Sequence, residues 1–247
     1  MRSLIAVWRL ARLLAHVLHG VAVMKLEFGR LDAAGRHARI AWWSRKMLAV
    51  LGVRVESRGQ GRPGAKLVVA NHVSWLDIAA IHAVLPEARF VSKADVKHWP
   101  IVGAMVAGAG TLFIERASKR DALRVVHQSG EALQAGDTVA VFPEGTTGAG
   151  PELLPFHANL LQAAISTEVP IQPVALRWHE PGERFSTSAR FIGETTLLQS
   201  VWAIVTARGL AVDVQILPAE QTAHADRRAM AEHMREQITA ALAGDAR

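Results

Sequence analysis

Residues 67–77 read LVVANHVSWLD, and this stretch indicates a buried strand that turns directly into a helix. Four consecutive apolar residues, Leu67–Ala70, fit a strand that is covered on both faces. Ser74 is a residue type that caps helix amino termini, so a helix is predicted to begin near Ser74. A covered strand followed at once by a helix is the repeating unit of α/β folds.

The same alternation continues along the rest of the chain after residue 51. The predicted strands are Val53–Glu56, Leu67–Ala70, Arg89–Ser92, Thr111–Ile114, Thr138–Phe142, Ile171–Leu176 and Val212–Ile216. The predicted helices are Trp75–Val84, Lys119–Gln134, Ala158–Thr167, Leu197–Ala207 and Ala225–Leu242. This pattern predicts an α/β fold with a mixed, largely buried sheet flanked by helices. A chain of 247 residues suits one such domain, predicted at residues 52–247, with a small extension before it.

Residues 1–51 predict two helices that carry both basic side chains and tryptophans. The first, within residues 1–28, has an uncharged run, Leu13–Met24, that is well short of the roughly 20 residues that cross a bilayer. The second covers residues 35–51 and has a basic side opposite an apolar side. Such a pair is typical of a hairpin that lies on or dips into a membrane, so residues 1–51 are predicted to be a membrane-associating extension.

Two other interpretations of residues 1–51 stay open. One is an ordinary helical pair packed on the core of the protein. The other is a secretion signal, but Arg9 and Arg12 interrupt its apolar stretch, and no small-x-small cleavage site before Lys25 is convincing.

The charge balance predicts an anionic partner. Lys and Arg number 28 against 22 acidic residues, which gives a net charge of +6 and a pI near 10.4. Nucleic acid and an anionic membrane surface both fit this excess. Seven tryptophans and no tyrosine favour the membrane interface, and the chain has no recognisable nucleic-acid-binding motif, so no nucleic-acid partner is predicted. The absence of cysteine excludes disulfides and thiolate metal sites.

His72 and Asp77 are the candidate catalytic pair. Five residues of ideal helix rotate a side chain by roughly 140°, so the pair can meet only if His72 lies in the turn after the strand and Asp77 in the first helical turn. Histidine is a base near neutral pH, and a carboxylate on its second ring nitrogen fixes its tautomer. The chain has neither a cysteine nor a Gly-x-Ser-x-Gly motif, which favours a base that activates a hydroxyl of the substrate. The alternative is a plain turn with a partly exposed histidine.

Further candidate residues follow other predicted strands. Glu144, Gly145 and Thr146 belong to a turn, FPEGTTG, whose backbone N–H groups and hydroxyls suit an anionic oxygen. Arg116 ends another strand and suits a phosphate, although a surface pair with Glu115 is an alternative. No cluster of residues has metal-ligand spacing, so no metal is predicted.

Four motifs occur in order, Asn-His-x4-Asp, Phe-Ile-x-Arg, Phe-Pro-Glu-Gly-Thr and Val-Pro-Ile-x-Pro-Val, over roughly residues 66–180. In this the chain resembles the glycerolipid acyltransferase family, specifically its bacterial 1-acylglycerol-3-phosphate acyltransferases. The resemblance implies that His72 is the general base and Asp77 its orienting carboxylate. It also implies that the acceptor is bound by Arg116, the Glu144–Thr146 turn and Lys93, the lysine before a Trp-Pro-x-x-Gly segment.

The resemblance further implies the partners of the protein. The donor would be acyl-CoA or acyl-carrier protein, the acceptor a lysophospholipid in a phospholipid surface, and the product phosphatidic acid, without a cofactor. The expected location is the cytoplasmic face of the inner membrane, either monotopic or with one embedded amino-terminal segment.

The chain departs from the family pattern at two positions. Thr147 stands where an arginine is common, and His157 stands where lysine is usual. The loss of a cation at residue 147 leaves a lyso-ornithine lipid or another lysolipid open as the acceptor. A non-catalytic membrane-binding protein and a basic nucleic-acid-binding domain are alternatives from other classes.

Overall fold

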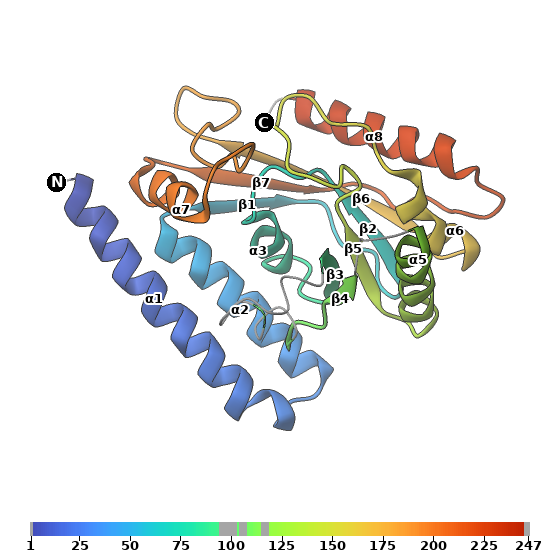
Figure 1. The fold of residues 1–247 in the computed structure, drawn as a ribbon, viewed down its shortest axis with the longest axis horizontal. Helices are drawn as coiled ribbons and strands as arrows, with labels where there is room; N and C mark the ends of the chain where they lie inside the picture. Colours follow the sequence, from blue (N-terminus) through green and yellow to red (C-terminus); the bar gives the residue numbers. More distant parts are fainter. Residues whose placement is uncertain (1, 94–102, 104–107, 115–118, 245–247) are drawn as a thin grey trace.

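The computed structural model describes residues 2–93, 103, 108–114 and 119–244 of the chain. Helices and strands alternate along most of it (Figure 1). The elements in chain order are α1 (Arg2–Leu26), η1 (Phe28–Arg30), α2 (Ala33–Leu51), β1 (Arg54–Arg58), β2 (Lys66–Ala70), α3 (Asp77–His82), β3 (Ala88–Lys93), β4 (Leu112–Ile114), α5 (Lys119–Gln134), β5 (Thr138–Val141), η3 (Ala158–Leu161), α6 (Gln162–Ser166), β6 (Ile171–His179), α7 (Leu197–Thr206), β7 (Ala211–Ile216) and α8 (Arg227–Ala243).

The strands form one seven-stranded sheet in the order β1-β7-β6-β2-β5-β3-β4. Strands β6, β2, β5, β3 and β4 are parallel, whereas β7 is antiparallel to β6 and β1 is parallel to β7. The predicted α/β class, the mixed sheet and all seven predicted strands are confirmed. Since parallel strands need crossover connections, helices cover both faces of this sheet.

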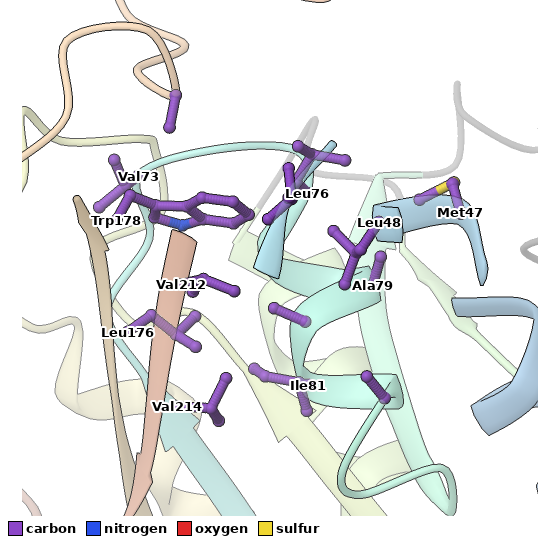
Figure 2. Close-up of a cluster of buried hydrophobic side chains, with 14 of the residues drawn as sticks. Met47, Leu48, Val73, Leu76, Ala79, Ile81, Leu176, Trp178, Val212 and Val214 are labelled. Atoms are coloured by element: carbon purple, nitrogen blue, oxygen red, sulfur yellow. The ribbon is translucent and has the colours of Figure 1, made fainter. Parts of the chain in front are cut away.

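The apolar strand β2 serves two cores because its side chains alternate between the two faces. Val68 and Ala70 belong to a core covered by α1, α2, α3 and α7, part of which Figure 2 shows. Leu67 and Val69 belong to a second core, beneath α5, α6 and α8 (Figure 1). A run of four buried apolar residues therefore marks a central strand, as its composition predicts.

Helix α2 is part of the core as well as the second helix of the predicted extension. Asp32 caps its amino terminus by accepting from the Gly35 N–H at 2.8 Å, and Gly52, at φ +84°, ends it. Leu48 and Leu51 are completely buried in the same cluster as Val68 of β2. The predicted boundary at residue 51 thus separates a helix from a strand, while one apolar core runs across it.

Helix α1 has 25 residues, about 37 Å at a rise of 1.5 Å per residue. By length and composition the segment Ser3–Arg30 could cross a membrane, and only 17% of its apolar window is buried. The sequence predicts a shorter apolar run because Arg9 and Arg12 interrupt it. In the structure, Arg9 turns inward and donates to the carbonyls of Val205 and Ala207 at the end of α7.

One local prediction differs from the structure, and one proline has an unusual place in the sheet. Helix α3 begins at Asp77, not near Ser74, because Val73 and Ser74 donate their N–H groups to the Asp77 carboxylate in a preceding turn. Pro173 lies inside the central strand β6, although prolines favour strand edges. Its carbonyl accepts from the Leu217 N–H just past the end of β7, and the Leu217 carbonyl accepts from the Gln172 side chain.

Candidate active site

The candidate residues gather at one edge of the sheet. Because β2, β5 and β6 are parallel neighbours, their carboxyl ends lie together. His72 follows β2 by two residues and Glu144 follows β5 by three, while Trp178 lies near the carboxyl end of β6. Binding and catalytic sites of α/β proteins lie at this edge, where loops leave the strands.

His72 and Asp77 meet as their spacing predicts. His72 lies in the turn after β2 and Asp77 is the first residue of α3, and the His72 Nδ1 lies 2.8 Å from the Asp77 Oδ2. Donation from Nδ1 to the carboxylate leaves Nε2 as the basic nitrogen of the neutral ring. The His72 side chain is 19% exposed, whereas Asp77 is completely buried. The His72 ring is therefore held by a buried carboxylate and is partly exposed to solvent.

The Asp77 carboxylate is fixed by four donors. Besides the His72 ring, its Oδ2 accepts from the backbone N–H groups of Val73 at 2.7 Å and Ser74 at 2.9 Å. Its Oδ1 accepts from the Trp178 indole N–H at 2.6 Å. Buried carboxylates need such partners, and charge-assisted bonds of this kind are strong. They hold the carboxylate, and with it the orientation of the His72 ring.

The sequence pattern does not reveal Trp178. The predicted strand ends at Leu176, but β6 continues to His179, and its alternation places Trp178 on the face of Leu176. Figure 2 shows the Trp178 ring among Val73, Leu76 and Val212, beneath the turn between β2 and α3. Because a buried indole N–H needs an acceptor, the sequence could have indicated that Trp178 has a polar partner. Only the folded structure shows that this partner is Asp77.

An aromatic surface supports the His72 ring on its other side. The ring is stacked on Phe142, with ring centres 4.0 Å apart and planes 9° apart. Phe142 in turn stacks on Phe90, at 5.4 Å. Aromatic stacking together with the Asp77 bond restrains the ring in two directions.

Glu144, in the FPEGTTG loop, contacts the turn that carries His72. It is buried, and its Oε1 accepts from the His72 N–H at 2.7 Å while its Oε2 accepts from the Leu154 N–H at 2.9 Å. The sequence predicts a contact with the acceptor, but both oxygens face backbone donors of the protein. The carboxylate is placed to hold the His72 backbone and the loop together.

The other predicted residues of the FPEGTTG loop, Gly145 and Thr146, follow Glu144 directly. Gly145 has φ +72°, and a Cβ there would lie 3.0 Å from the His157 ring, so the turn requires glycine. Thr146 is exposed at the tip of the loop. The Thr147 hydroxyl, at the position where relatives of this pattern commonly carry arginine, donates to the Phe191 carbonyl.

Of the two predicted cationic residues, Lys93 and Arg116, only Lys93 lies in the part of the chain that the structure describes. Lys93 is the last residue of β3, and its backbone pairs with Ile114 of β4. Arg116 lies outside the described residues. Among the residues that the structure describes, no group of three His, Asp or Glu side chains is arranged to hold a metal ion.

The buried Glu144 carboxyl makes the stability of the fold depend on pH. Burial raises the pKa of Glu144 above its usual value of 4.5, and the hydrogen bonds from His72 and Leu154 oppose this only in part. The folded state therefore binds this proton more tightly than the unfolded state. The resulting stabilisation is complete below pH 4.5 and is lost as the pH rises through the raised pKa.

We expect Glu144→Gln to remove this dependence. The free energy of unfolding of the wild type, relative to the variant, should fall as the pH rises from about 4.5 through that window. Urea unfolding of both proteins in detergent micelles across this range measures the difference. Parallel curves would show that the Glu144 proton is bound equally in both states.

The geometry suits general-base chemistry. The His72 side chain is partly exposed, and the buried Asp77 stabilises the imidazolium that forms when Nε2 takes a proton. A hydroxyl that reaches this nitrogen becomes a nucleophile.

Comparison with known proteins agrees with these features. The family model described as Acyltransferase matches residues 52–177. The 1-acyl-sn-glycerol-3-phosphate acyltransferase of Neisseria gonorrhoeae is 39% identical over 198 residues, 79% of this chain and 76% of that protein. The lyso-ornithine lipid O-acyltransferase of Pseudomonas aeruginosa is 35% identical over 205 residues, 83% of this chain and 78% of that protein.

A solved structure shares the fold. The crystal structure of the 1-acyl-sn-glycerophosphate acyltransferase PlsC from Thermotoga maritima superposes with a TM-score of 0.75 at 19% identity. The match covers 98% of this chain and 97% of that one. With the four motifs, the dyad at the sheet edge and a family match over half of its length, this chain belongs to the glycerolipid acyltransferase family.

Proposed function

We propose that the protein transfers a fatty acyl group from a thioester to the free hydroxyl of 1-acylglycerol-3-phosphate, which yields phosphatidic acid. The observation that carries the proposal is the 2.8 Å contact between the His72 Nδ1 and the buried Asp77 carboxylate, in a histidine side chain that is partly exposed. The relatives named 1-acyl-sn-glycerol-3-phosphate acyltransferase support the choice of acceptor.

In the proposed reaction His72 moves one proton twice. Its Nε2 takes the proton of the acceptor hydroxyl while the oxygen attacks the thioester carbonyl carbon. The tetrahedral intermediate collapses, the C–S bond breaks, and the imidazolium returns the proton to the leaving thiolate. Asp77 holds the ring and stabilises its charged form throughout. General-base action supplies about 10² to 10⁴ in rate, and positioning of the two substrates must supply much of the rest.

The acceptor phosphate would be bound by cations and backbone donors near the dyad. In this proposal Arg116 forms a bidentate pair with the phosphate, and Lys93 adds a second positive charge. The turn at Gly145 and Thr146 offers backbone N–H groups to an oxygen of the head group. Glu144 contributes indirectly, because it holds this turn against the His72 backbone.

The place of the reaction follows from its substrates. Both the lysolipid and the product dissolve in a bilayer, and α1 is long and apolar enough to reach into one. We propose that the enzyme works on the cytoplasmic face of the inner membrane, where acyl-CoA or acyl-carrier protein can deliver the acyl group. The net charge of +6 favours an anionic lipid surface.

A lyso-ornithine lipid is the second candidate acceptor. Relatives with this named activity are 35% identical in Pseudomonas aeruginosa and 32% identical in Brucella abortus. Thr147 supports this candidate, because its side chain carries no charge and its hydroxyl is bonded to the Phe191 carbonyl. A site with one cation fewer has less advantage for a phosphate.

A panel of acceptors distinguishes the candidates. Thiol release from acyl-CoA and from acyl-carrier protein is measured with 1-acylglycerol-3-phosphate and with lyso-ornithine lipid, and products are identified by mass. We expect the higher kcat/KM with 1-acylglycerol-3-phosphate. A higher kcat/KM with lyso-ornithine lipid would show that this lipid is the preferred acceptor. The absence of thiol release with both acceptors would contradict the proposed activity and favour a non-catalytic membrane-binding protein.

A further inference from the structure

Helix α7 exposes an apolar face outside the amino-terminal pair of helices. Leu198 is 82% exposed, Trp202 is 49% exposed and Leu197 is 42% exposed. Leu198 and Trp202 are four residues apart, so they lie on the same face of the helix. The opposite face is buried in the core through Ser200 and Ile204. Large apolar side chains gathered on an exposed helix face mark a surface that binds something.

Helix α7 packs against α1. The Arg9 guanidinium of α1 donates to the carbonyls of Val205 at 2.8 Å and Ala207 at 3.2 Å. Its positive charge there offsets the partial negative charge at the carboxyl end of α7. Figure 1 shows α7 beside the first half of α1. In that half, Leu4 is 74% exposed and Trp8 is 63% exposed. Two neighbouring helices that are far apart in the sequence thus each expose large apolar side chains.

The same helix contacts the catalytic turn. The Trp75 indole N–H donates to the hydroxyl of Ser200, a buried residue of α7, at 3.1 Å. Trp75 lies in the chain between the two dyad residues His72 and Asp77. Whatever holds the outer face of α7 therefore also restrains the turn that carries the catalytic base.

We propose that Leu197, Leu198 and Trp202 of α7 enter the same bilayer as α1 and are a second membrane contact of the enzyme. This inference rests on the proposed function, which places the active site at a membrane. Helix α7 carries no charged residue, and tryptophan is favoured at the membrane interface. Arg208, exposed just beyond the helix, suits an anionic head group. Lipid is the occupant that both the packing against α1 and this arrangement favour.

The contact would set the depth of the active site. With α1 alone, the body of the protein could rotate about one helix axis. A second contact on α7 fixes the orientation, and the Trp75 to Ser200 bond transmits it to the catalytic turn. The acceptor hydroxyl of a lipid could then meet His72 without leaving the interface.

The chain contains no cysteine, so a single fluorophore can be placed at one chosen site. The full-length Leu198→Cys protein, labelled with an environment-sensitive dye, is reconstituted into vesicles of phosphatidylcholine and phosphatidylglycerol. Leu123→Cys is the matched control, because Leu123 is 71% exposed on α5, which covers the opposite face of the sheet. Trp202→Cys provides a second position on α7.

We expect labels at residues 198 and 202 to be quenched severalfold more by nitroxide lipids than the label at residue 123, and severalfold less by aqueous iodide. Iodide access at residue 198 equal to that at residue 123, in vesicle-bound protein, would overturn the proposal. Protection from both quenchers would mean that another protein chain covers α7 and would overturn it equally.

The same samples separate this inference from the proposed function. Thiol release from acyl-CoA is measured in the labelled vesicles that contain 1-acylglycerol-3-phosphate. A lipid-quenched label without thiol release leaves the contact standing and removes the activity. Normal thiol release with an iodide-quenched label removes the contact and leaves the activity standing.

Discussion

His72→Ala is expected to lower the rate of acyl transfer by about 10²- to 10⁴-fold in a protein that still folds. The substitution removes the nitrogen that takes the acceptor proton, and no other described histidine lies in contact with Asp77. Little stability is lost, because Asp77 keeps its three other donors and the backbone bonds of His72 to Glu144 and Gly148 remain. Steady-state thiol release measures the rate, and circular dichroism measures the fold.

His127→Ala is the matched control for this variant. His127 is 76% exposed on α5 and pairs only with Glu131 on the same helix, so its loss should leave the rate unchanged. Wild-type turnover by a folded His72→Ala protein would show that another group is the base.

Asp77→Asn is expected to reduce both activity and stability. The Asp77 oxygens accept from four donors, and an amide must turn its own NH₂ group toward at least one of them. The amide also disfavours the ring tautomer that has a basic Nε2, an effect of about 10⁴ in kcat for an orienting carboxylate. Leaving buried donors unpaired costs about 1–3 kcal/mol each, so the free energy of unfolding should fall by several kcal/mol.

The two effects are measured separately. Urea unfolding in micelles gives the stability, and thiol release below the unfolding transition gives the activity. Asp32→Asn is the control, because Asp32 is an exposed amino-terminal cap of α2 and asparagine caps helices equally well. If Asp77→Asn kept both wild-type stability and wild-type rate, the four-donor arrangement would have no functional meaning.

The sequence predicts most of the fold because its elements have strong local signals. Short β-branched runs marked all seven strands, and Lys119–Gln134 is a helix with the predicted bounds. The start of α3 is predicted too early because a side chain competes for the backbone. The Asp77 carboxylate accepts from the backbone N–H groups of Val73 and Ser74, which hold the preceding residues in a turn.

The candidate site was predictable only in its local part. The spacing of His72 and Asp77 restricts them to one geometry, and the structure has it. Trp178, in β6, is 101 residues from its partner Asp77, and Glu144, just after β5, is 72 residues from its partner His72. No local sequence pattern predicts which strands are neighbours in the sheet. Sequence alone also gives Glu144 a substrate contact, whereas its two oxygens face backbone N–H groups.

The amino-terminal helices show the same limit. In the sequence, Arg9 interrupts the apolar stretch of the first helix and counts against a secretion signal. In the structure, its charge is directed to the carboxyl end of α7, so it does not lie on the outer face of α1. The partner of Arg9 is nearly 200 residues distant, and only the folded chain reveals it.

A rapid-mixing measurement of thiol release with and without acceptor tests most directly whether His72 activates the lipid hydroxyl itself. The full-length protein in vesicles is mixed with acyl-CoA at comparable concentration. The proposed mechanism predicts no burst of thiol in the absence of 1-acylglycerol-3-phosphate, and one thiol released for each phosphatidic acid formed in its presence. A burst equal to the amount of enzyme without acceptor would reveal an acyl-enzyme and contradict the mechanism.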